Sequence, residues 1–140
     1  MATTYDTVWD MFVLSSGLPV EVLPHEERYI KPIIQEAIDY YNEVTDADMN
    51  GFLDADDNTE LITPNLNRRQ VRLLSECVHL KVLEMLLEDF EVEWQFKQKE
   101  VESKFYNQQV AARQENIKSI EEHIDQVVSN MRSNEWFAWI

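Results

Sequence analysis

The chain has few of the residues that interrupt helices or cross-link chains. Its 140 residues include one cysteine, two glycines and four prolines. The single Cys77 excludes an internal disulfide, and the separated Gly17 and Gly51 exclude a glycine-rich phosphate loop. No apolar run approaches the roughly 18 residues that span a bilayer, and no signal peptide is recognisable. We therefore expect long helices, synthesis in the cytoplasm and no membrane partner.

Positive charge is also scarce. The chain has 12 basic and 27 acidic residues, which give a formal net charge of −15. Residues 1–66 hold fourteen acidic and two basic residues, a net −12, whereas residues 67–140 carry a net −3. A protein that grips a phosphate backbone needs clustered basic side chains. The composition therefore disfavours both tight DNA binding and contact with anionic membranes.

Apolar residues recur every three or four positions, which predicts helices. The predicted helices cover residues 4–16, 29–44, a segment from just after Pro64 to Phe90, and 105–131. The third has the widest apolar arc, which is typical of a helix buried on several sides. The sequence therefore predicts an all-α fold, a small helical bundle with a long central helix and extended termini. We expect one domain over residues 1–140.

The last predicted helix has a narrow apolar seam, spaced 3, 4, 3 and 4 residues apart. The seam consists of Ile117, Ile120, Ile124, Val127 and Met131. Such a seam packs against one helix, either within the chain or on a neighbouring copy.

Residues that could do chemistry are dispersed. His25, His79 and His123 are far apart in sequence, and no nucleophile elbow or metalloprotease motif occurs. We therefore expect no catalytic residues, no cofactor and no enzyme activity.

One acidic segment, expected to be a loop over residues 45–66, resembles a calcium-binding loop in its spacing. The candidate oxygen ligands are Asp46, Asp48, Asn50, Asp54 and Asp57. Gly51 stands where such loops turn sharply, but Asp57 replaces the usual glutamate and no second loop is present. A divalent-metal site and a plain solvated loop both remain open.

The C-terminal segment is unusually aromatic. It contains Trp136, Phe137, Trp139 and Ile140. Tryptophan and phenylalanine are favoured anchors at protein interfaces. These residues are predicted to bind a partner, although packing onto the chain's own core is the alternative. We expect the arm 1–25 and the tail 132–140 to become ordered on assembly.

The order of these segments resembles a known family. The chain begins MATTYDTVWDMFVLSS and continues with EERYIKPIIQEAIDYYNEV, the Asp-rich DADMNGFLDADDN, ELITPNLNRRQVRLLSECVHLKVLEML and SKFYNQQVAARQENIKSI. This succession resembles head–tail connector (adaptor) proteins of siphovirus-like tailed bacteriophages. The resemblance covers roughly residues 1–125 and depends on pattern and register.

The resemblance implies a structural virion protein at the neck. It implies a homo-oligomeric ring, a dodecamer, beneath the portal protein and above further neck or tail proteins, through which DNA passes without specific binding. Two other classes stay open: a single-site calcium-binding module, and an acidic helical protein that binds a partner as an inhibitor or DNA mimic.

Overall fold

The structure is a computed structural model that describes residues 3–50, 53–63, 65–95 and 103–138, without the side chains of 20, 27, 46–50, 92–95, 103–106 and 131–138. The described part holds four α-helices: α1 (Tyr5–Ser16), α2 (Glu27–Asn50), α3 (Arg68–Gln95) and α4 (Ser103–Ala138). It also holds a 3₁₀ turn, η1 (Val20–Val22), and three short strands: β1 (Thr3–Thr4), β2 (Asp54–Asp56) and β3 (Leu61–Thr63). The mostly helical fold is confirmed, and the small sheet is an addition that the sequence did not predict.

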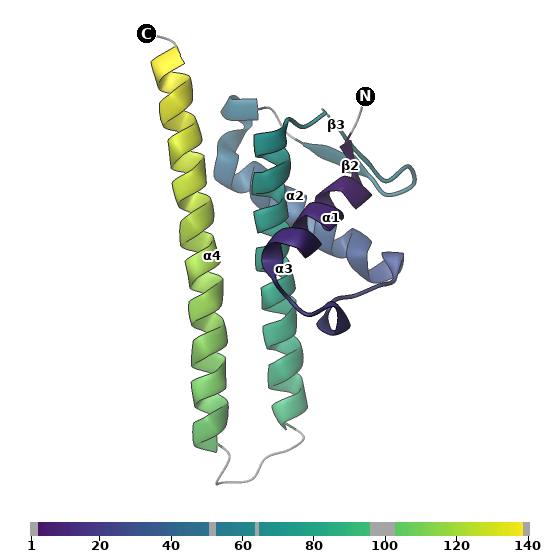
Figure 1. The fold of residues 1–140 in the computed structure, drawn as a ribbon, viewed down its shortest axis with the longest axis vertical. Helices are drawn as coiled ribbons and strands as arrows, with labels where there is room; N and C mark the ends of the chain where they lie inside the picture. The colour runs from purple at the N-terminus through teal and green to yellow at the C-terminus, as the bar shows by residue number, and fades with distance from the viewer. Residues whose placement is uncertain (1–2, 51–52, 64, 96–102, 139–140) are drawn as a thin grey trace.

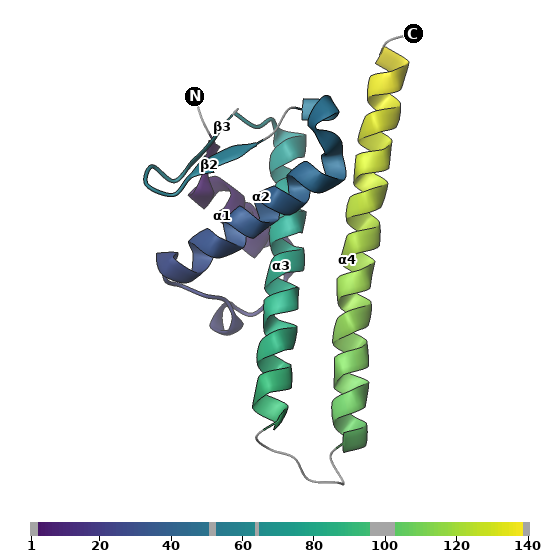
Figure 2. The same cartoon turned by 180° about the vertical axis from the view of Figure 1, so that it is seen from behind.

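Helix α3 is the centre of the fold. Helices α1 and α2 cross it on opposite sides, and α4 runs beside it in the opposite direction (Figures 1 and 2). Leu74, Cys77 and Val78 on α3 are completely buried. A helix that contacts three others needs apolar residues around most of its circumference. The prediction of a buried central helix is therefore confirmed.

Helix α1 begins and ends where the sequence indicates. The Thr4 hydroxyl caps it by accepting a hydrogen bond of 3.2 Å from the Thr7 amide. Gly17 ends it with a φ of 69°, a left-handed conformation that glycine adopts without steric cost. Val8 and Phe12 share one face and are fully buried. The described part of the arm predicted over residues 1–25 thus packs on the chain's own core.

Helix α2 is longer than predicted at both ends. It begins at Glu27, so Pro32 lies beyond the first turn, where it removes one backbone hydrogen bond. It continues to Asn50 rather than ending at Val44. The Asn42 side chain donates to the Leu53 carbonyl (3.0 Å) and accepts from the Leu53 amide (2.9 Å). This pair of bonds holds the following segment against the helix.

The predicted acidic loop over residues 45–66 is wrong as a description of the backbone. Its first part belongs to α2, and its second part forms an antiparallel hairpin in which Ala55 pairs with Ile62. Strand β1 adds to the other side of β3, with Thr3 paired to Ile62, so the sheet order is β1-β3-β2. Ile62 is fully buried, which joins the sheet to the core.

The entry to α3 is a reciprocal cap at Asn67, later in the chain than the start just after Pro64 that the apolar pattern predicted. The Asn67 side chain accepts from the Gln70 amide, and the Gln70 side chain accepts from the Asn67 amide, both at 2.9 Å. The buried Thr3 hydroxyl accepts from the Leu66 amide at 2.9 Å. The start of the chain is therefore tied to the start of α3.

The seam of α4 packs within the chain. Ile124 is fully buried against the core, and Ile117, Ile120 and Val127 are partly buried beside it. Of the two alternatives for the seam, packing within the chain therefore holds for these side chains. The side chain of Met131 lies outside the described residues.

Candidate interaction surfaces

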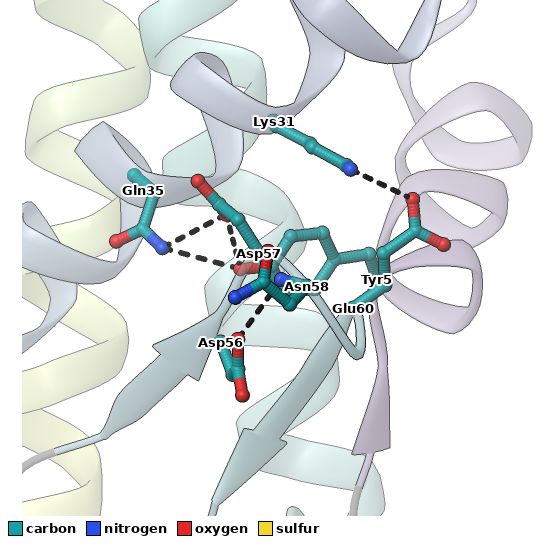
Figure 3. Close-up of polar contacts among 7 residues, drawn as sticks. All are labelled: Tyr5, Lys31, Gln35, Asp56, Asp57, Asn58 and Glu60. Carbon is teal, nitrogen blue, oxygen red and sulfur yellow. Dashed lines mark hydrogen bonds and ion pairs between the residues drawn. The ribbon is translucent and has the colours of Figure 1, made fainter.

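A polar cluster connects the N-terminus, α2 and the β2–β3 turn (Figure 3). The Tyr5 hydroxyl donates a 2.7 Å hydrogen bond to Asp57 Oδ1. Gln35 Nε2 lies 3.1 Å from the same oxygen and 3.3 Å from the Ala55 carbonyl, and donates to both. Three segments that are distant in sequence therefore meet at one carboxylate.

The turn itself is held by further polar contacts. Glu60 has a φ of 56°, in the left-handed region that a residue with a Cβ rarely adopts. Its carbonyl accepts a 3.0 Å bond from the Tyr5 amide, and its carboxylate lies 3.5 Å from Lys31 Nζ. Asn58 closes the turn by donating its amide to Asp56 Oδ1 at 2.9 Å. These contacts over-determine the turn and so maintain the strained residue.

The pKa shifts of Tyr5 and Asp57 are those of a structural hydrogen bond. Burial is the main cause that raises the pKa of Tyr5, and the hydrogen bond to Asp57 and its charge raise it further. The hydrogen bonds from Gln35 and Tyr5 lower the pKa of Asp57. Tyr5 therefore stays protonated and Asp57 ionised at neutral pH, which suits a fixed hydrogen bond and not proton transfer.

The candidate metal ligands do not share one loop. Asp46, Asp48 and Asn50 lie on the helical backbone of α2, with side chains outside the described residues. Asp54 is exposed on β2, and Asp57 is engaged by Tyr5 and Gln35. Among the described residues, no three His, Cys, Asp or Glu side chains are placed to hold a metal.

The histidines are placed as packing or surface residues. The His79 ring lies 5.8 Å from the Phe12 ring, and burial lowers the pKa of His79. His123 Nε2 lies 4.0 Å from a Glu76 carboxylate oxygen. His25 is exposed ahead of α2. Across residues 3–138, apart from the gaps, no helix is long and apolar enough to cross a membrane.

Acidic side chains form a surface on α2, and carboxylates of α4 act on a tyrosine within it. Glu36, Asp39 and Glu43 are exposed on α2, three and four residues apart, and so share one face. The pKa of Tyr40, between them, is raised to about 12, and burial is the largest cause. The negative charges of Asp125 and Glu121 on α4 contribute to this rise, as does that of Glu43. Tertiary packing thus brings carboxylates from both halves of the chain around one phenol.

Two grooves flank α3. The first, of about 480 Å³, lies between α2 and α3 and contains Arg28 and Lys81. Both cations have acidic partners: Arg28 lies 2.6 Å from Glu26, and Lys81 lies 3.4 Å from Glu84.

The second groove, of about 630 Å³, lies between the 18–22 segment, α3 and α4. It is lined by Leu18, Pro19, Val22, Leu86, Phe90 and Arg113, among others, and is called the α3–α4 groove below. The Arg113 guanidinium lies 4.4 Å from the centre of the Phe90 ring. Arg113 was not among the residues predicted to matter, although it precedes Ile117 by one helical turn and so continues the register of the seam.

The C-terminal end of α4 extends beyond the rest of the fold. Helix α4 is 36 residues long and α3 is 28. In both views the yellow last turns of α4 extend past the N-terminal end of α3 (Figures 1 and 2). These turns include the backbone of Trp136 and Phe137, whose side chains lie outside the described residues, as do Trp139 and Ile140 altogether. The tail is thus helical at least to Ala138, although an extended terminus was expected.

The fold and surfaces define a small, acidic, mostly helical protein whose polar cluster is structural and whose grooves lie beside the central helix. A family model described as YomZ prophage protein matches residues 1–133. The chain therefore belongs to the YomZ prophage protein family and is phage-derived. No curated protein and no solved structure matches it.

Proposed function

We propose that this phage-derived protein is a structural virion protein, a head–tail connector that forms a ring beneath the portal protein. The observation that carries the proposal is the projection of α4 past the rest of the domain, with aromatic residues in its last turns. Aromatic residues held away from the body of a subunit are suited to bury themselves in another one. The role is architectural and involves no catalysis.

The acidic surface supports the passage of DNA. Exposed carboxylates on Glu36, Asp39 and Glu43 repel phosphates, so a ring lined by this face would keep the duplex centred without binding it. Twelve copies with a net charge of −15 each would give the ring a charge of about −180. The more balanced residues 67–140 are left for contacts with neighbouring copies, the portal protein and downstream neck or tail proteins.

The composition of phage particles tests the proposal. Particles released by the induced prophage are purified and analysed by mass spectrometry, and the protein is co-expressed with the portal protein of the same prophage for electron microscopy. We expect about twelve copies per particle and a ring on the portal. Absence of the protein from particles, together with no ring on the portal, would contradict the connector role.

A truncation tests whether the projecting last turns of α4 are needed for the ring. Removal of residues 134–140 should leave the circular dichroism spectrum and unfolding midpoint nearly unchanged but abolish the ring, because the last turns of α4 project past the rest of the fold. Asn130→Ala, an exposed substitution on the same helix, is the matched control and should assemble normally. Normal rings from the truncated chain would refute the role given to these turns.

The exposed carboxylates favour a second candidate, an acidic protein that binds a basic partner as a DNA mimic. Such a protein would be absent from particles, and its complex would dissociate as salt screens the charges. Particle composition and the salt dependence of partner binding therefore separate the two candidates.

A further inference from the structure

The α3–α4 groove combines an apolar floor with two charged side chains of opposite sign. Leu86 and Phe90 come from α3, and Leu18 and Val22 come from the segment after α1. Val22 is 45% exposed, which is unusual for a large apolar side chain of this domain. The charged lining residues are Asp89 and Arg113.

Arg113 is incompletely satisfied within the chain. Its Nε atom is buried and has no hydrogen-bond partner among the described residues. Its guanidinium lies over the Phe90 ring, and none of the ion pairs found among the described residues includes Arg113. A guanidinium is well suited to a two-point bond with a carboxylate, and a buried, unsatisfied donor is costly. The groove is therefore built to receive a segment that carries an acid beside apolar groups.

The last turns of α4 have that composition. Arg132, Glu135 and Trp136 lie three and four positions apart on the helix, so their positions share one face. The segment presents a cation, an anion and an aromatic residue, and the groove offers Asp89, Arg113 and an apolar floor. The charges match in both signs.

The segment cannot reach the groove of its own chain. Residues 113 and 135 are on the same continuous helix, so the rise of 1.5 Å per residue separates them by about 33 Å. Only another copy can supply the segment. The contact joins two different surfaces, and repetition of it generates a ring or a filament.

Building on the proposed function, we propose that the last turns of α4, around Glu135 and Trp136, dock in the α3–α4 groove of the next copy, with Glu135 paired to Arg113 and Arg132 to Asp89. The groove and the docking segment are separated along the axis of α4, so each copy is displaced from the next along that axis. The contact therefore closes into a ring only if α4 lies close to the plane of the ring. A large component along the ring axis would give an open helical filament instead.

Exchange of the two charges tests this contact on the full-length chain. Sedimentation velocity over a range of concentrations should show that the wild type self-associates. Arg113→Glu and Glu135→Arg should each weaken association about tenfold or more, because each opposes two like charges. An equimolar mixture of the two variants should recover association, since every groove meets a segment of opposite charge when the two variants alternate. Lys118→Glu and Glu122→Arg, at exposed positions outside the groove, are matched controls and should behave as the wild type.

The mixture separates docking from a structural role for Arg113, because a folding defect in one chain is not repaired by another chain. A monomeric wild type, or a mixture that stays dissociated, would overturn the inference. Particle analysis is independent of it: connectors found in particles without groove-dependent association would refute the docking and leave the connector role. Groove-dependent association of a protein that is absent from particles would refute the connector role alone.

Discussion

The hydroxyl of Tyr5 donates a 2.7 Å hydrogen bond to the carboxylate of Asp57, which lies 52 positions further along the chain. The bond joins the start of α1 to the turn between β2 and β3 (Figure 3). Because Gln35 of α2 donates to the same oxygen, the contact also fixes the hairpin against α2. The N-terminal segment is thereby part of the domain and not a separate arm.

Tyr5→Phe should lower the free energy of unfolding by about 1–2 kcal/mol, because it removes the donor while the ring stays buried. Urea denaturation followed by circular dichroism measures the change. Tyr29→Phe is the control: the Tyr29 side chain is 52% exposed, so its effect should stay within about 0.5 kcal/mol. Equal effects of the two substitutions would show that the bond to Asp57 contributes nothing.

Tyr40 should make the protein less stable in alkali. Its pKa rises from an ordinary 10.0 to about 12 in the folded state, so folding holds the phenol proton more tightly than the unfolded chain does. This contribution is fully present below pH 10 and is lost as the pH rises from 10 to about 12. Urea titrations at pH 8 and pH 11 should therefore show a smaller loss of stability in Tyr40→Phe than in the wild type. An identical loss in both proteins would contradict the pKa assigned to Tyr40.

Glu60 provides a test of backbone strain. Because its φ is 56°, Glu60→Gly should be more stable than Glu60→Ala by about 1 kcal/mol, the reverse of the order at a helical position. Both substitutions remove the ion pair with Lys31. The difference between them therefore reports the free-energy cost of the left-handed backbone at residue 60. Thermal unfolding of the two variants gives the difference. A more stable alanine variant would show that residue 60 is not left-handed in solution.

Ile124 tests whether α4 packs on its own chain. Ile124→Ala should cost about 2–5 kcal/mol, because the side chain is fully buried and its removal leaves a cavity. The loss should not depend on protein concentration, as expected for a contact within one chain. Gln126→Ala, two positions away and exposed, is the control and should have little effect. A loss that disappears on dilution would instead place the seam between copies.

The spacing of apolar residues was sufficient to predict a helix wherever that helix buries a regular apolar stripe. The spacing of Val8 and Phe12, the wide apolar arc around Leu74 and the seam through Ile124 predicted α1, α3 and the packed face of α4. It failed between residues 45 and 66, where two strands of three residues each are too short for alternation to be visible. The hairpin is held by partners outside it, Asn42 and Tyr5, which a local pattern cannot show.

Some candidate surfaces are visible in the local sequence, and others depend on tertiary packing. The acidic stripe on α2 and the aromatic residues after Met131 are local and could be read from the chain. The α3–α4 groove could not, because Arg113 and Phe90 belong to different helices and become a site only when those helices pack. An arginine in the register of an apolar seam was the one signal that pointed to it.

By itself the amino-acid sequence determined that the protein is acidic, mostly helical and centred on one apolar helix, because composition and helical period are properties of short segments. Only the tertiary structure decided that Tyr5 meets Asp57, that carboxylates of α2 and α4 both raise the pKa of Tyr40, and that the end of α4 projects beyond the core. Those relationships depend on how the helices cross, and the crossing follows from the packing of the whole core.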